Sequence, residues 1–200
     1  MEIRGSESRN GIRGDPKPMA RREIEAKLNS MGDYVRIDYL VRCLKQGLDF
    51  DTRKFVLTKL ADLYNAKGMY NEAGRMLAGA ADINATFQGK INDYIKTAEF
   101  FVKGLDFDSA DGAFNKAVAC ANGLQKDVIK NKRREMYMSQ AKALLVRDKR
   151  KNAMDVYEKL LSIDLSSEDK RQVQSTLLTL YEKLGKVKEF YSLKRNMSLS

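Results

Sequence analysis

Cationic side chains are concentrated between Lys126 and Lys151, where ten lysines and arginines accompany three acidic residues. They form two clusters, which consist of Lys130, Lys132, Arg133 and Arg134 and of Arg147, Lys149, Arg150 and Lys151. Clusters of this kind can neutralise phosphate groups without reading a base sequence. The alternative is that they are a solvated helix face. Nucleic acid or another anionic surface is therefore one hypothesis for the partner of this protein.

The helix expected over residues 127–147 would place the two clusters roughly 25 Å apart, at about 1.5 Å of rise per residue. That separation argues against a single phosphate site. The helix dipole favours the cations of 147–151, which lie at the expected carboxyl end, but not those of 130–134, which we expect near the start. Cations at a helix start favour a partner with negative charge.

Support for catalysis or for a cofactor is weak in this sequence. It contains no histidine, which removes the usual general base near neutral pH. It has neither a glycine-rich phosphate loop nor a Cys/His cluster with metal-ligand spacing. Cys43 and Cys120 lie within apolar helical patterns, which favours reduced, buried thiols. We therefore expect a protein that is not an enzyme and binds no cofactor.

The sequence Gly-Leu-Asp-Phe-Asp occurs at residues 47–51 and again at 104–108. Its aspartates could suggest calcium, but counting from Asp106 the sixth position is Asp111 rather than the glycine of an EF-hand loop. Its glycine suits the left-handed position after a helix, and either aspartate can cap the next helix. The copies are 57 residues apart, which places the first between helix hairpins and the second inside one.

Composition indicates a helical protein without a membrane anchor. The chain has 200 residues, of which 43% are hydrophobic and 32% charged, values that suit amphipathic helices. No apolar run is long enough for a membrane span or a signal peptide, so we expect a cytoplasmic protein. Residues 1–17 are polar and predict a flexible tail, while Pro18 suits the first turn of a helix.

Hydrophobic periodicity predicts helices throughout the rest of the chain. Residues 18–51 are expected to form an N-terminal helical pair. Eight more helices are expected at about 52–67, 71–83, 89–103, 108–122, 127–147, 150–163, 167–184 and 187–197. The short turns between them carry Gly68, Gly104, Asp148 and Gly185. Short turns make neighbouring helices antiparallel, so these eight helices predict four hairpins.

Small and bulky residues recur at matching places in the four hairpins. In the first helices the small position holds Ala61, Thr97, Ala141 and Leu178. Three residues later the bulky position holds Tyr64, Phe100, Leu144 and Tyr181. In the second helices the small position holds Ala73, Ala110, Ala153 and Phe190. Small residues allow helices to approach closely, and bulky residues fill the space above them.

This pattern resembles tetratricopeptide repeats over residues 52–200, and its longer, uneven period resembles the soluble NSF-attachment-protein type of α-solenoid. The resemblance implies an all-α, right-handed superhelix of antiparallel hairpins that acts as a non-catalytic scaffold or adaptor. The carboxylate clamp of chaperone-binding members is absent, since Thr58 and Asp62 occupy the corresponding places.

In such arrays the first helices line the concave face, which binds a peptide or a helix of another protein. The partner-binding residues expected there are Tyr94, Phe101, Met138, Lys142 and Leu145. We expect the apolar members to form an exposed groove beside the charge of Lys142. Two alternatives remain: a neighbouring helix covers these residues, or the chain is a structural subunit with exposed apolar surface on its terminal helices. The oligomeric state is left open.

Overall fold

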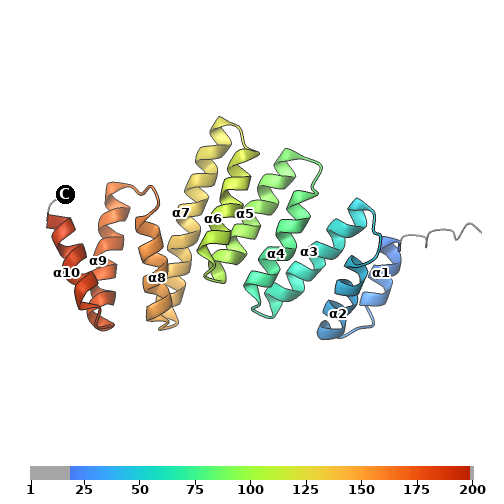
Figure 1. Cartoon of the computed structure of the whole chain (residues 1–200), viewed down its shortest axis with the longest axis horizontal. Coiled ribbons are helices and arrows are strands. Elements are labelled where there is room, and N and C mark those ends of the chain that lie inside the picture. The colour runs from blue at the N-terminus through green and yellow to red at the C-terminus, as the bar shows by residue number, and fades with distance from the viewer. Residues whose placement is uncertain (1–18, 199–200) are drawn as a thin grey trace, which may run out of the picture.

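The computed structural model describes residues 19–198, and within that range the chain forms α-helices and no strand. The ten helices described are α1 (Arg21–Leu28), α2 (Asp33–Leu44), α3 (Phe50–Ala66), α4 (Tyr70–Asp82), α5 (Phe87–Lys103), α6 (Phe107–Ala119), α7 (Gly123–Val146), α8 (Arg150–Leu161), α9 (Ser167–Lys183) and α10 (Val187–Ser198). They follow one another in chain order along the long axis of the molecule (Figure 1). The predicted all-α helical-repeat fold is confirmed. The predicted tail, together with Pro18, lies outside the described residues.

Side-chain caps explain where several helices begin. The Asp49 carboxylate accepts a hydrogen bond from the Thr52 backbone N–H at 2.8 Å and starts α3. Asp106 does the same for Ser109 at 3.1 Å and starts α6. In both copies of the Gly-Leu-Asp-Phe-Asp motif the first aspartate therefore caps a helix. The first copy caps α3, which begins a hairpin, and the second caps α6, which is the second helix of a hairpin. Asn122 forms a capping box with Gln125, so α7 begins four residues earlier than predicted.

One turn geometry recurs at the four hairpin turns from α3 to α10. Each contains one residue with a positive φ, and these are Gly68 (72°), Leu105 (60°), Asp148 (54°) and Gly185 (68°). The next residue donates its backbone N–H to the carbonyl five positions earlier at 2.8–2.9 Å, which is the Schellman pattern. Gly104 was predicted at the left-handed position but has φ −80°, so that prediction is wrong.

These turns define which residues are equivalent in successive hairpins. The carbonyls that accept the Schellman bond belong to Tyr64, Phe101, Leu144 and Tyr181. The bulky position of α5 is therefore Phe101 rather than Phe100, and the small position is Ala98 rather than Thr97. The sequence alignment was wrong by one residue because α5 buries all four of these side chains, so its apolar pattern fits either register. The second-helix alignment is confirmed, with Ala73, Ala110 and Ala153 fully buried.

The core continues from the N-terminal pair into the repeats. One apolar cluster joins α1, α2 and α3 through Ile24, Leu28, Leu40, Cys43, Val56 and Leu60. The domain boundary expected at residues 51 and 52 falls inside α3. At the other end α10 has no buried residue, since Phe190 and Leu193 are only partly covered and Tyr191 is exposed. Among the described residues, α1 thus contributes buried side chains at one end of the array, whereas α10 contributes none at the other.

Gly74 allows α4 to approach the Phe101 ring, and Gly74→Ala tests this contact. An added Cβ would lie 2.8–2.9 Å from three atoms of that ring. Overpacking costs about 1–3 kcal/mol, which outweighs the helix-propensity gain of about 1 kcal/mol, so we expect a net loss of about 1 kcal/mol in chemical denaturation. Gly112→Ala in α6 is the matched control, because nothing lies within 4 Å of its Cβ. It should raise the stability, and an equal loss in both variants would contradict the packing explanation.

A candidate partner-binding face

Tyr94 and Phe101 are buried in the structure. Contrary to the prediction, they therefore do not form part of an exposed apolar groove. Tyr94 is 6% exposed and donates its hydroxyl to Asp82 Oδ1 at 2.5 Å. Phe101 is also 6% exposed and packs on Gly74. Both are core residues, and the one-residue register error in α5 explains why they were expected on the surface.

The turn-defined register places other residues of α5 on the outer side of the first helices. We call the side of α3, α5, α7 and α9 that faces away from the second helices the first-helix face. Its equivalent positions hold Asp62 in α3, Glu99 and Val102 in α5, Met138, Lys142 and Leu145 in α7, and Ser175 and Thr179 in α9. Three predicted residues therefore remain on this face. Lys142 is exposed, while Met138 and Leu145 are half-buried.

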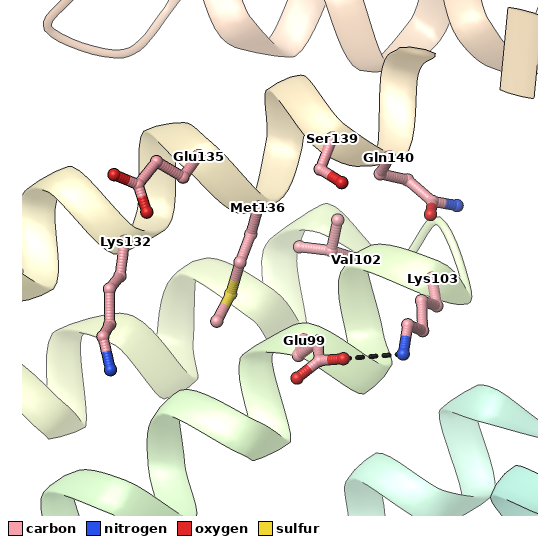
Figure 2. A pocket seen from close by; sticks show the side chains of 8 residues that line it. All are labelled: Glu99, Val102, Lys103, Lys132, Glu135, Met136, Ser139 and Gln140. Carbon is pink, nitrogen blue, oxygen red and sulfur yellow. Dashed lines mark hydrogen bonds and ion pairs between the residues drawn. The ribbon is translucent and has the colours of Figure 1, made fainter. Parts of the chain in front are cut away.

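A cleft of about 350 Å³ separates α5 from α7 on this face (Figure 2). Met136 is half-buried and supplies apolar surface, while the buried Val102 forms part of the cleft wall. The Lys103 ammonium pairs with Glu99 at 2.6 Å, whereas Lys132 and Glu135 make no ion pair with any described residue. Ser139 and Gln140 complete the lining. We call this the α5–α7 cleft, and it offers a small apolar surface beside unpaired charges of both signs.

Two further clefts continue along α7 towards α9. One, of about 500 Å³, is lined by Arg134, Glu135, Met138, Ser139, Lys142 and Asp169. It shares Glu135 and Ser139 with the α5–α7 cleft, so the two meet across α7. The other, of about 410 Å³, contains Leu145, Arg150 and Lys183 beside hydroxyl groups of α9. By contrast, ion pairs bridge α3 and α5, with Lys96 Nζ 3.6 Å from Asp62 Oδ1.

The first basic cluster is partly neutralised within the fold. It begins about two turns inside α7, so the expectation that it lies near the helix start is wrong. Arg133 Nη2 lies 2.7 Å from Asp111 Oδ1, and Lys130 Nζ lies 3.8 Å from Asp127. Arg134 donates to Asn131. Only Lys132 of this cluster has neither a charged nor a polar partner among the described residues.

The second basic cluster remains more available. It surrounds the turn between α7 and α8, and its four cations are exposed. Arg150 pairs with Asp148 at 2.8 Å. Arg147, Lys149 and Lys151 make no ion pair with any residue in the range 19–198.

Asp111 joins three consecutive helices. Its carboxylate, on α6, accepts hydrogen bonds from Arg133 and from the Tyr137 hydroxyl of α7, at 2.7 and 3.1 Å. Lys159 Nζ of α8 lies 2.6 Å from its other oxygen. The charged side chains are only 21–26% exposed, so solvent screens them incompletely. In the sequence Asp111 is notable only as a position that does not fit a calcium loop, and its structural role could not be predicted because its partners are 22 or more residues away.

Buried tyrosines pair with carboxylates at three of the helix contacts. Besides Tyr94 and Tyr137, the Tyr181 hydroxyl donates to Glu158 at 2.9 Å. Burial, and then the hydrogen-bonded carboxylate, raise the pKa of the Tyr94 and Tyr181 hydroxyls. Burial and the charge of Asp111 raise the pKa of Tyr137. The protonated phenols are thus part of the packed structure.

Stability should fall at alkaline pH because the folded chain holds these phenol protons more tightly than the unfolded chain. The contribution of these protonated phenols to the free energy of unfolding is fully present below the pKa of an unfolded tyrosine, near 10. It is lost as the pH rises towards the higher pKa of the folded chain. Tyr137→Phe should lower the unfolding free energy at pH 8 by about 1 kcal/mol. It should also flatten the alkaline decline by up to about 1.4 kcal/mol per pH unit in denaturant titrations. Tyr191→Phe, at an exposed site, should change neither, and an unaltered slope in Tyr137→Phe would contradict the assignment.

Across residues 19–198, no helix combines the length and the apolar character that crossing a membrane requires. Neither a protein-family model nor a curated protein sequence matches the chain. Among solved structures it is similar to BtubC (BKLC) from P. vanneervenii, with 15% identity and a TM-score of 0.36. The match covers 86% of this chain and 74% of that chain. A score this low assigns neither a family nor a function.

Proposed function

We propose that this protein is a non-catalytic, tetratricopeptide-like interaction module, a scaffold or adaptor, that binds a peptide or helix of another protein along the first-helix face. The observation that carries the proposal is the run of clefts from α5 across α7 to α9. Equivalent positions of successive hairpins line these clefts. A repeat that presents the same positions side by side forms an extended binding surface without needing one deep pocket.

The chemistry of the face defines the kind of segment it would bind. Met136 and Met138, both half-buried, offer apolar surface in adjoining clefts. Unpaired charges accompany them, positive at Lys132 and Lys142 and negative at Glu135. The matching partner is an amphipathic segment with spaced apolar side chains and charges of both signs. Apolar contacts would supply most of the affinity, and the charges would set register and direction.

A photo-crosslinking residue at position 139 tests this proposal, because Ser139 lines both the α5–α7 cleft and its neighbour. We expect a crosslinked protein from native lysate with Ser139 replaced, and none with Asn115 replaced on the exposed side of α6. Lys142→Glu should reduce the crosslink, whereas Arg75→Glu on α4 should not. Equal crosslinking yields from positions 139 and 115 would contradict binding on the first-helix face. A crosslinking yield that Lys142→Glu leaves unchanged would contradict it as well.

The second candidate is binding of nucleic acid through the second basic cluster. It is favoured by the unpaired Arg147, Lys149 and Lys151, and by a cleft that Arg150 shares with Lys183 of the next hairpin. Phosphate contacts would make the affinity fall steeply between low and moderate salt, whereas apolar contacts on the first-helix face would respond little. Capture that survives nuclease and moderate salt would exclude this candidate. Loss of capture on nuclease treatment, with sensitivity to Lys149→Glu, would favour it.

A further inference from the structure

Three large apolar side chains project into solvent where first helices begin. Phe50, Phe87 and Leu124 are 77%, 73% and 84% exposed, and each is the first or second residue of α3, α5 or α7. Phe50 and Phe87 are 37 residues apart, as are Phe87 and Leu124. Because these helices run in the same direction, their starts share one edge of the array, the upper edge in Figure 1. We call this row the apolar edge.

Each of these helices has a side-chain cap, so the apolar residues are not needed for capping. Asp49, Thr86 and Asn122 each accept one backbone N–H at the three starts. Bulky apolar side chains at the exposed starts of three successive first helices form a row, unlike apolar residues scattered singly over a surface. Such a row points to a partner surface that covers it.

We propose that the occupant of the apolar edge is a second copy of this chain, related by a two-fold axis at Phe87. Phe87 lies in the middle of the row with one apolar residue on each side, so that rotation exchanges the two ends of the row. Phe87 would meet the partner's Phe87, and Phe50 would meet the partner's Leu124, on each side of the axis. Such an isologous contact closes on itself and forms a dimer rather than a filament.

The charges beside the row favour the antiparallel arrangement. Asp51 follows Phe50, Lys126 lies two residues after Leu124, and both are exposed without an ion pair to any described residue. Asp127 is already engaged by Lys130 at 3.8 Å. The two-fold axis brings Asp51 towards the partner's Lys126 twice, whereas a parallel arrangement would place Asp51 against Asp51. Opposite charges across an interface fix register and suppress the wrong pairing.

The area available implies a weak dimer. Each aromatic side chain can bury about 150–250 Å². Four phenylalanines and two leucines, with their polar neighbours, would bring the interface to about the lower limit of 1,200 Å² for specific complexes. The dimer should therefore depend on concentration, and the charge pairs should make it weaken with salt.

Sedimentation velocity of the full chain tests the proposal over about 5–500 µM, where a complex of this size dissociates measurably. We expect a monomer–dimer equilibrium whose Kd rises about tenfold or more with Phe87→Ser, since both copies lose a ring at the axis. The exposed position of Phe87 keeps the fold intact, which circular dichroism verifies. Tyr191→Ser on α10 is the matched control and should leave Kd unchanged.

A charge-reversal experiment tests the antiparallel geometry. Asp51→Lys and Lys126→Glu should each weaken self-association, because each places like charges together twice. Mixing the two variants should restore dimers, since the two reversed residues then face each other with opposite charges and the two unaltered residues form the other pair. A monomer at every concentration, a dimer indifferent to Phe87→Ser, open-ended polymers or failure of the mixture to dimerise would each overturn the proposal. The apolar edge and the first-helix face are different surfaces, so this failure would leave the proposed function standing.

Discussion

Asp111→Ala should lower the unfolding free energy by about 2–4 kcal/mol, measured by urea or guanidinium denaturation at neutral pH. The substitution leaves Arg133 and Lys159 three-quarters buried and close to each other without the carboxylate that separates their charges. The Tyr137 hydroxyl, inside a fully buried side chain, also loses its acceptor. Unpaired buried polar groups cost more than the pair contributed, so the loss should exceed that of a surface ion pair.

Asp38→Ala is the matched control for Asp111→Ala. Asp38 pairs with Arg42 at 2.8 Å, but both side chains are more than 60% exposed. Its loss should cost no more than about 0.5 kcal/mol. Asp111→Asn keeps an acceptor but removes the charge, and should fall between the two. Similar losses for Asp111→Ala and Asp38→Ala would show that the three-helix contact adds nothing to stability.

Local signals were sufficient to predict the fold from sequence. Helix periodicity, capping residues such as Asp49 and Asp106, and turns at Gly68 and Gly185 act within a few residues of each other. Each expected helix therefore occurs close to its predicted bounds. The exception at Gly104 has a tertiary cause. Leu105 takes the left-handed position that Gly104 was expected to fill, while a Cβ on Gly104 would collide with the Asn71 side chain of α4.

The candidate site was harder to predict because it depends on which sides of α5 its neighbours cover. Buried residues occur on nearly every side of this helix, including the adjacent pairs Thr97 and Ala98 and Phe100 and Phe101. Because this pattern has no unique polar face, the repeat register of α5 can be assigned only from the turn that follows the helix. Met138, Lys142 and Leu145 lie on the first-helix face of α7, where buried residues are confined to one side of the helix, and their role in partner binding stays a prediction.

Contacts between residues distant in sequence explain what else was missed. Arg133 is indistinguishable from its cationic neighbours in the sequence, yet Asp111 engages it from another helix. The same holds for the apolar edge, because Phe50 and Phe87 precede the helices expected at 52–67 and 89–103 and carry no sequence signal of a shared surface. Only the packed structure shows that no described part of the chain covers them.

Phe114→Ala should destabilise the protein by about 3–5 kcal/mol and also divide its unfolding into two stages. Phe114 is 1% exposed and lies between the Tyr137 ring, with centroids 6.4 Å apart, and the Arg133 guanidinium, 5.9 Å from its centroid. It packs α6 against α7, whose mutual contact is smaller than those of α4 with α5 or α5 with α6. In a linear array stability is a sum of units and interfaces, so weakening the smallest inner joint should uncouple its two sides.

Hydrogen exchange read segment by segment measures that uncoupling. In the native protein, amides of α3–α6 and of α7–α9 should share a similar opening free energy if the array unfolds cooperatively. Phe114→Ala should separate them, with α7–α10 opening at lower free energy because α10 has no buried residue to hold it. Phe190→Ala, at the terminal joint, is the control and should lower protection in α10 alone. Uniform loss of protection in Phe114→Ala would contradict a weak inner joint and show that the helices from α1 to α10 unfold as one unit.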